Sequence, residues 1–166
     1  MENLLESCFD REIGENIFAD IYEGRVWKTF AGSNNQPFFV KNTLEVHIGF
    51  ALNLDWFNPC KHIQYSVGVI YLTILNLPRH IRFREENTFV VGIIPGPYEP
   101  NVDEIHKYIE PLVDELLQLW AGQVIRSPNY PIGRIYRAAL IMISCDTPAA
   151  RKVMHFGFTY YLIVKF

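Results

Sequence analysis

The stretch from Val46 to Pro59 constrains the fold more than any other part of the chain. It reads V-H-I-G-F-A-L-N-L-D-W-F-N-P, an apolar run up to Leu54 followed by a single acid, Asp55. A run this apolar predicts a strand that is buried on both faces, in the middle of a sheet. A carboxylate at the end of such a strand is costly to bury unless something pairs with it or binds it. Asp146 closes a second apolar run, A-L-I-M-I-S-C-D, and we therefore expect the two acids to belong to one site.

The composition indicates one globular domain. The chain has 166 residues, of which 49% are hydrophobic and 20% charged, which suits a chain with a sizeable core. Its three cysteines are widely spaced and lack a C-x-x-C motif, which predicts reduced thiols inside a cell and argues against a disulfide framework or a closed zinc site. No apolar run reaches the roughly 18 residues of a membrane span, and the acidic start of the chain lacks a secretory apolar core. We therefore expect a nuclear or cytoplasmic protein that is neither secreted nor in a membrane.

The charge of the chain does not point to a nucleic-acid partner. The net charge is −3, whereas phosphate neutralisation dominates the affinity of proteins that bind nucleic acid unaided. Two local basic clusters occur, at Arg79, His80, Arg82 and Arg84 and at Arg151 and Lys152. A solvated, charged face is the more common explanation for clusters of this kind.

The predicted elements follow the order strand, strand, strand, helix, strand, helix. Apolar runs at 46–54, 65–77 and 88–94 are joined by short connections, which favours an antiparallel meander. A helix follows from Asn101 or Asp103 to about Trp120, and Pro111 predicts a kink or a restart within it. Residues 123–133 are predicted to be a loop, 135–145 a fourth buried strand and 148–154 a helix. Before the meander, we expect a short helix near the start of the chain and a peripheral strand or loop at 20–30.

This order predicts an α/β fold, an incomplete ribonuclease H-like core with a mixed sheet. Three antiparallel strands and a crossover helix lead into a strand parallel to the first, and in that fold the first and fourth strands each carry a catalytic acid. Asp55 and Asp146 fall at these places. Neighbouring strands lie about 4.8 Å apart, so the acids could share a Mg²⁺ ion, which prefers oxygen ligands. Two alternatives stay open, in which Asp55 makes an Asx turn and Asp146 caps a helix.

Five sequence blocks resemble the transposase family of CACTA-type (En/Spm-like) DNA transposons, in that family's order over about residues 20–152. The blocks are L-N-L-D-W-F-N-P, Y-S-V-G-V-I-Y-L-T-I-L-N-L-P, G-I-I-P-G-P-x-E-P, Y-I-E-P-L-V-D-E-L-L-Q-L-W and R-A-A-L-I-M-I-S-C-D-T-P-A-A-R-K. The resemblance implies that Asp55 and Asp146 are catalytic and metal-binding residues, the first two acids of a D-D-E/D triad. It also implies DNA as the partner, Mg²⁺ as the cofactor with Mn²⁺ as a substitute, and cut-and-paste transposition in the nucleus.

The chain departs from the family pattern after Lys152. The family continues into a Gly- and Cys-rich segment, whereas residues 147–166 here contain neither that pattern nor any Asp or Glu. We therefore expect a truncated or frame-disrupted copy that binds metal weakly or not at all and is inactive in strand cleavage and transfer. Its parts are then a peripheral segment at 1–40, a partial catalytic core at 41–154 and a divergent apolar tail at 155–166. The alternative is a non-catalytic, transposon-derived interaction module that self-associates or pairs with full-length relatives through this tail.

Overall fold

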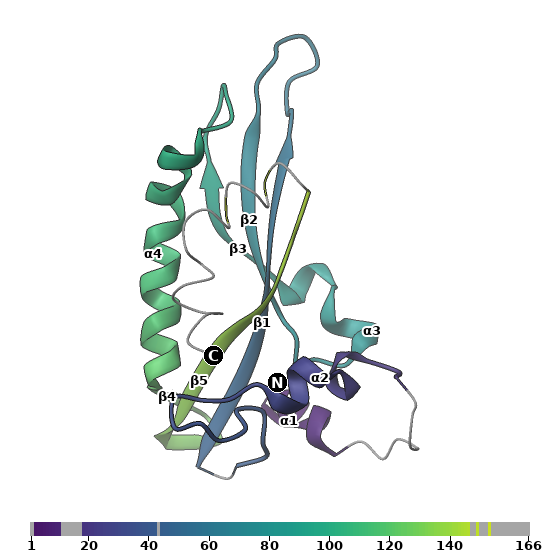
Figure 1. Ribbon diagram of the computed structural model, residues 1–166, viewed down its shortest axis with the longest axis vertical. Helices are drawn as coiled ribbons and strands as arrows, with labels where there is room; N and C mark the ends of the chain where they lie inside the picture. The colour runs from purple at the N-terminus through teal and green to yellow at the C-terminus, as the bar shows by residue number, and fades with distance from the viewer. Residues whose placement is uncertain (1, 11–17, 43, 147–148, 150–152, 154–166) are drawn as a thin grey trace.

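A mixed five-stranded sheet with one long helix on its face forms the centre of the protein (Figure 1). The computed structural model describes residues 2–10, 18–42, 44–146, 149 and 153. The strand order is β3-β2-β1-β5-β4, with only β1 and β5 parallel. The strands are β1 (Glu45–Phe57), β2 (Val67–Ile74), β3 (Thr88–Ile94), β4 (Gln123–Ser127) and β5 (Tyr130–Cys145). The predicted α/β class, the antiparallel meander and the parallel fourth strand are therefore confirmed.

The central position of β1 follows from its apolar sequence. Leu52 and Leu54 are each 1% exposed on one face, and Ala51 is buried against the other. β1 pairs with β2 from Phe50↔Ile74 to Phe57↔Val67, and its register with β5 shifts by one residue after Phe50. A strand that is hydrogen-bonded on both sides and buried on both faces can carry few polar residues, which is why the run at 46–54 predicted it.

The helix α4 (Val102–Ala121) covers one face of the sheet. It begins with a capping box, in which the Asn101 side chain accepts a hydrogen bond from the Glu104 backbone and the Glu104 carboxylate accepts one from Asn101. Its apolar stripe packs on the core strands and consists of Ile105, Ile109, Val113 and Leu116. The stripe has the spacing of a helix with one buried face.

Pro111 lies inside α4 without dividing it. The prediction of a restart is therefore wrong. The ring removes the bond to the carbonyl of Lys107, and both residues are exposed, so water can satisfy that carbonyl. The helix ends at Gly122, whose φ of 98° is readily adopted only by glycine and whose N–H donates to the carbonyls of Gln118 and Leu119.

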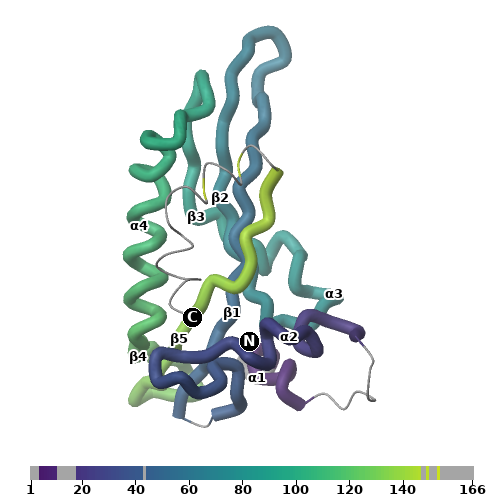
Figure 2. The backbone as a smooth tube through the Cα atoms, viewed as in Figure 1, coloured from purple at the N-terminus to yellow at the C-terminus, as the bar shows by residue number. Residues whose placement is uncertain are grey.

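The N-terminal part of the chain packs on the other face of the sheet. It contains α1 (Glu2–Glu6), the 3-10 turns η1 (Ser7–Phe9) and η2 (Ile21–Glu23), and α2 (Arg25–Thr29). The peripheral strand or loop expected at 20–30 is thus helical, because Asp20 and Glu23 form a capping box that starts η2. Trp27 and Phe39 stack with ring centroids 3.7 Å apart above Gly49, where an added Cβ would lie 2.9 Å from the Trp27 ring. Figure 2 shows this segment wrapping the lower end of β1.

The segment 123–133, expected to be a loop, forms an antiparallel hairpin. β4 pairs with the first part of β5, from Gln123↔Tyr136 to Ser127↔Tyr130. Val124 and Ile125 are exposed, so the strand has no buried face and therefore none of the alternation that identifies a strand in a sequence. Two short elements, α3 (Arg79–Arg82) and η3 (Glu85–Asn87), connect β2 to β3.

The expected last helix and the tail fall mostly outside the described residues. Ala149 and Val153 are described, both helical and both buried in the core under α4. The tail at 155–166, with the pairing role considered for it, lies outside the described residues. In the part of the chain that the structure describes, no helix is long and apolar enough to span a membrane.

Candidate active site

The fold brings Asp55 and Asp146 to the same end of two neighbouring strands. The parallel register of β1 and β5 ends with the pair Leu54↔Cys145, and each acid is the next residue of its chain. Leu54 and Cys145 pack toward α4. Because side chains alternate along a strand, Asp55 points to the opposite face of the sheet from Leu54. Asp146 directly follows the last residue of β5, and both acids are exposed.

The backbone around Asp55 excludes the Asx turn that the sequence left open as an alternative. β1 continues through Asp55, which lies opposite Val69 of β2, and ends only at Phe57. An Asx turn at Asp55 is therefore wrong. Its side chain is exposed, and its carboxylate makes no hydrogen bond or ion pair with any described residue.

Asp146 does act as a helix cap. Its Oδ1 accepts a hydrogen bond of 2.8 Å from the backbone N–H of Ala149, the bond that an N-capping acid makes. Its Oδ2 has no hydrogen-bond partner among the described residues. The capping bond fixes the carboxylate in place at the strand end and leaves one oxygen available for a ligand.

The chemistry of these two acids suits a hard divalent cation. Mg²⁺ commonly binds through one or two protein carboxylates and completes its shell with water and substrate phosphates. Within the described ranges, no group of three or more His, Cys, Asp or Glu side chains is placed to hold a metal. Burial, and to a lesser degree the Asp146 charge, raises the pKa of the Cys145 thiol, so a neutral thiol rather than a thiolate adjoins the acids.

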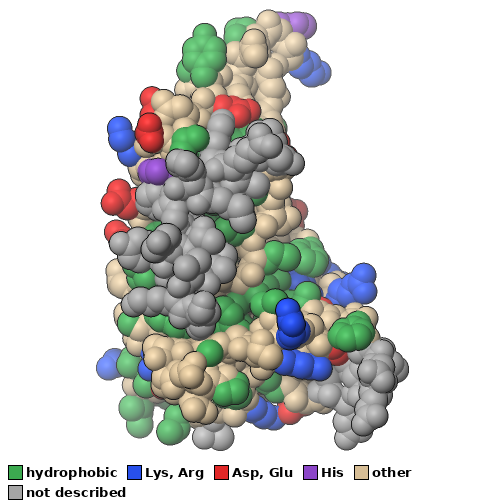
Figure 3. All heavy atoms as spheres, in the orientation of Figure 1, with side chains coloured by type: hydrophobic (Ala, Val, Ile, Leu, Met, Phe, Trp, Pro, Cys, Tyr) green, Lys and Arg blue, Asp and Glu red, His purple; other side chains and the backbone are tan. Residues whose placement is uncertain are grey.

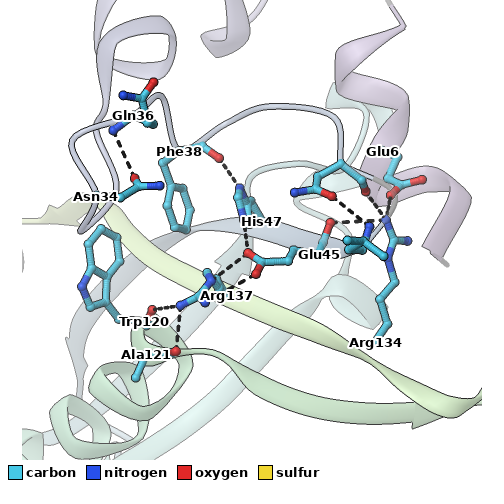
Figure 4. Close-up of polar contacts among 12 residues, drawn as sticks. Glu6, Asn34, Gln36, Phe38, Glu45, His47, Trp120, Ala121, Arg134 and Arg137 are labelled. Atoms are coloured by element: carbon cyan, nitrogen blue, oxygen red, sulfur yellow. Dashed lines mark hydrogen bonds and ion pairs between the residues drawn. The ribbon is translucent and has the colours of Figure 1, made fainter.

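A second polar network lies at the other end of β1 and β5 (Figure 4). The Glu45 carboxylate accepts a 2.8 Å hydrogen bond from Arg137 Nε and lies 3.0 Å from His47 Nε2. The Arg137 hydrogen bond, followed by that of His47, lowers the pKa of Glu45. His47 Nδ1 contacts the carbonyl of Phe38, which fastens the preceding loop to the strand.

Two arginines of β5 connect this network to both flanking helices. Arg137 Nη1 donates to the carbonyls of Trp120, at 3.2 Å, and Ala121, at 2.7 Å, at the C-terminus of α4. Arg134 Nη2 donates to the Glu6 carboxylate at 2.5 Å and also to the carbonyl of Asn42. A pocket of about 400 Å³ adjoins Arg137 and His47, but the bonds of the charged groups are made within the protein. The network is structural, and the sequence signal for it is two arginines three residues apart in a largely apolar strand.

The basic cluster at 79–84 is not one solvated face. Arg82 is 2% exposed and donates two hydrogen bonds to the Asp20 carboxylate, at 2.7 and 2.8 Å. It also donates to the Tyr22 hydroxyl and, through Nε, to the carbonyl of Leu77. Arg82 therefore fastens the N-terminal segment to the end of β2, and sequence alone did not distinguish it from its exposed neighbours Arg79 and Arg84.

Comparison with known proteins identifies the family. A scan against protein-family models matches the model described as Transposase family tnp2 over residues 16–158, which spans most of the chain and includes both strand-end acids. The searches of curated proteins and of solved structures found no match. The chain therefore belongs to the tnp2 transposase family, the transposases of CACTA-type (En/Spm-like) DNA transposons.

Proposed function

We propose that this chain is part of a DDE/D-type transposase catalytic domain, with Asp55 and Asp146 as its first two acids on a ribonuclease H-like sheet. The observation that carries the proposal is the parallel register of β1 and β5, which ends one residue before each acid. The strand order and the crossover through α4 support the same fold. Ala149 and Val153, buried under α4 after β5, favour a further helix on that face.

In this proposal the two carboxylates hold Mg²⁺, or Mn²⁺ in its place, beside the paired ends of β1 and β5. A bound Mg²⁺ lowers the pKa of its water and stabilises the leaving oxygen of a phosphodiester. Asp55 contributes a carboxylate that has no hydrogen-bond or ion-pair partner among the described residues. Asp146 contributes its Oδ2, while the bond from Ala149 to Oδ1 keeps the side chain from rotating away.

We also propose that the polypeptide of these 166 residues does not cleave or transfer DNA strands by itself. No acid follows Asp146 in the printed sequence, so two carboxylates hold the ion without a third. Mg²⁺ can bind to two carboxylates with water completing its shell, but the site then lacks the third acid of the D-D-E/D triad. Incubating supercoiled plasmid with the chain and Mn²⁺ tests this, since strand cleavage by the wild-type chain and not by Asp55→Asn would contradict it.

The metal site is tested by thermal shift during titration with Mn²⁺ and Mg²⁺. Wild-type chain, Asp55→Asn and Asp146→Asn are compared, because asparagine removes the charge and still caps a helix about as well as aspartate. Asp114→Asn is the matched control, since it removes an exposed acid from α4. We expect metal to raise the melting temperature of the wild type and the control but of neither strand-end variant.

Either of two results would contradict the shared site. An equal shift in all four proteins would indicate that the metal binds elsewhere. The absence of any shift up to millimolar metal would indicate that the acids are structural.

A further inference from the structure

The β1–β2 hairpin extends past the two acids and ends in an exposed loop (Figures 1 and 2). β1 continues from Asp55 to Phe57, which pairs with Val67 of β2, whereas the register with β5 has already ended at Leu54. Residues 58–66 close the hairpin, and the side chains from Asn58 to Gln64 are exposed. Any ligand seated on the strand-end acids therefore has this loop as its neighbour.

The loop carries positive charge in a protein that is negative overall. The segment N-P-C-K-H-I-Q-Y-S at 58–66 includes one lysine and one histidine and no acid, against a net charge of −3 for the chain. Lys61 and His62 make no hydrogen bond or ion pair with a described residue. Figure 3 shows a basic side chain and a histidine at this end of the molecule, beside hydrophobic side chains.

The loop is held in shape by its own hydrogen bonds. Asn58 Oδ1 accepts a 2.8 Å bond from the backbone N–H of Cys60, and Asn58 Nδ2 donates a 3.1 Å bond to the carbonyl of Ile63. These two bonds bracket Lys61 and His62. At the base, the N–H of Ser66 donates to the carbonyl of Pro97 at 2.9 Å, which joins the hairpin to the β3–α4 loop. A loop ordered in advance loses less entropy when it binds.

Exposed apolar side chains occur on the same hairpin and at its base. Tyr98 is 77% exposed and lines a pocket of about 350 Å³ between the hairpin base and the β3–α4 loop, together with Asn58 and Glu99. Phe57 and Ile63 are 47% and 67% exposed. Positive charge beside exposed aromatic rings is the combination that binds single strands of nucleic acid, because bases stack on the rings and phosphates meet the charge.

We infer that the β1–β2 hairpin tip is a DNA contact that positions the strand leading into the acid pair. Lys61 neutralises a phosphate of that strand, and Tyr98 stacks on an unpaired base. Glu99 beside Tyr98 favours this arrangement, because its charge would repel a phosphate at the pocket but tolerates a base. The inference rests on the proposed function, because DNA is expected at this end of the sheet only if Asp55 and Asp146 form the catalytic site.

Fluorescence anisotropy with a labelled 20-base single strand and the matching duplex tests the contact in the 166-residue chain. We expect Lys61→Ala to weaken binding about fivefold and to reduce the slope of log K against log salt by about one. Lys61→Arg keeps the charge and should bind like the wild type. The matched control is Lys28→Ala, which removes an exposed lysine of α2 at the far end of the molecule.

Tyr98 provides a second, independent measurement. Tyr98→Ala should weaken single-strand binding about fivefold or more and duplex binding less, because stacking requires an unpaired base. Tyr98→Phe keeps the ring and should be unaffected.

The inference is overturned if Lys61→Ala binds like Lys28→Ala, or if the wild-type chain does not bind DNA. The metal titration separates this failure from that of the proposed function. A metal shift that depends on Asp55, without any effect of Lys61, overturns the hairpin contact alone. An effect of Lys61 on DNA binding without any metal shift overturns the shared metal site and supports the contact.

Discussion

At the scale of the residue, Asn76 connects three segments of the fold by hydrogen bonds. No feature of the sequence indicated this role. Asn76 is fully buried and lies two residues past the end of β2. Its Oδ1 accepts a 2.8 Å bond from the N–H of Gly49, and its Nδ2 donates to the carbonyls of His47, at 2.9 Å, and Leu5, at 3.3 Å. One side chain thus joins α1, β1 and the chain leaving β2.

Asn76→Ala should reduce the free energy of unfolding by about 2–4 kcal/mol, because it removes the partner of the buried Gly49 N–H and the bonds to the carbonyls of His47 and Leu5. Urea denaturation at neutral pH measures the loss. Asn53→Ala, which removes an exposed amide from β1, should change the same quantity by less than about 1 kcal/mol. Similar losses in the two variants would show that the Asn76 bonds contribute little.

At the scale of the element, the accuracy of the predictions followed the length of the apolar runs in the sequence. The third strand was predicted at 88–94 and is found as Thr88–Ile94, because turn residues bound an apolar run on both sides. β4 was missed because it contains only two apolar residues, Val124 and Ile125, between polar ones. The site was likewise predicted only in part. Two apolar runs located Asp55 and Asp146 at strand ends. The bond from Ala149 to Asp146 depends on backbone geometry, and the partners of Arg82 are far from it in the sequence, so a linear pattern contains neither.

The C-terminus of α4 is the element-scale feature with a direct test. The last turn of the helix contains no basic residue, and Arg137 of β5 supplies the positive charge from outside. Arg137→Met should lower the free energy of unfolding at neutral pH by about 1–3 kcal/mol, because it removes hydrogen bonds to the terminal carbonyls of α4 and one of the two partners of Glu45, the other being His47. Arg126→Met, an exposed substitution in β4, is the control and should cost little.

The same variant has a pH signature. Arg137 lowers the pKa of Glu45 in the folded protein, so this stabilisation is present above the pKa of Glu45 in the unfolded chain and is lost as the pH falls through the folded value. The stability difference between wild type and Arg137→Met should therefore narrow on acidification below about pH 4.5. A difference that stayed constant from neutral to acidic pH would contradict the ion pair with Glu45.

At the scale of the whole molecule, the attachment of the N-terminal segment to the sheet depends on two buried acidic groups remaining protonated. Burial raises the pKa of Cys8 from 9.0 to about 12 and that of Tyr22 from 10.0 to about 12. The Tyr22 hydroxyl lies 2.9 and 2.8 Å from the carbonyls of Leu75 and Leu77. Cys8 packs in the same buried cluster as Tyr22 and Trp27.

The sign of the pH dependence follows from these raised values. Above about pH 9 the unfolded chain releases protons that the folded protein keeps, so the unfolded state binds fewer protons and stability falls as the pH rises. Each group contributes a slope of up to about 1.4 kcal/mol per pH unit between its unfolded and folded pKa. Alkali should thus unfold the protein well before the buried groups titrate in the native state.

Urea denaturation under reducing conditions at several pH values between 7.5 and 11 measures this slope. Cys8→Ala should have a lower free energy of unfolding than the wild type at pH 7.5, because it removes a buried sulfur. As the pH rises, its free energy of unfolding should fall less than that of the wild type, because only Tyr22 of the two buried groups remains. Cys60→Ala removes an exposed thiol and should keep the wild-type slope. If the free energy of unfolding fell equally steeply with pH in the wild type and in Cys8→Ala, the Cys8 thiol would ionise as easily in the folded protein as in the unfolded chain. The burial of Cys8 would then not be a cause of the sensitivity to alkali.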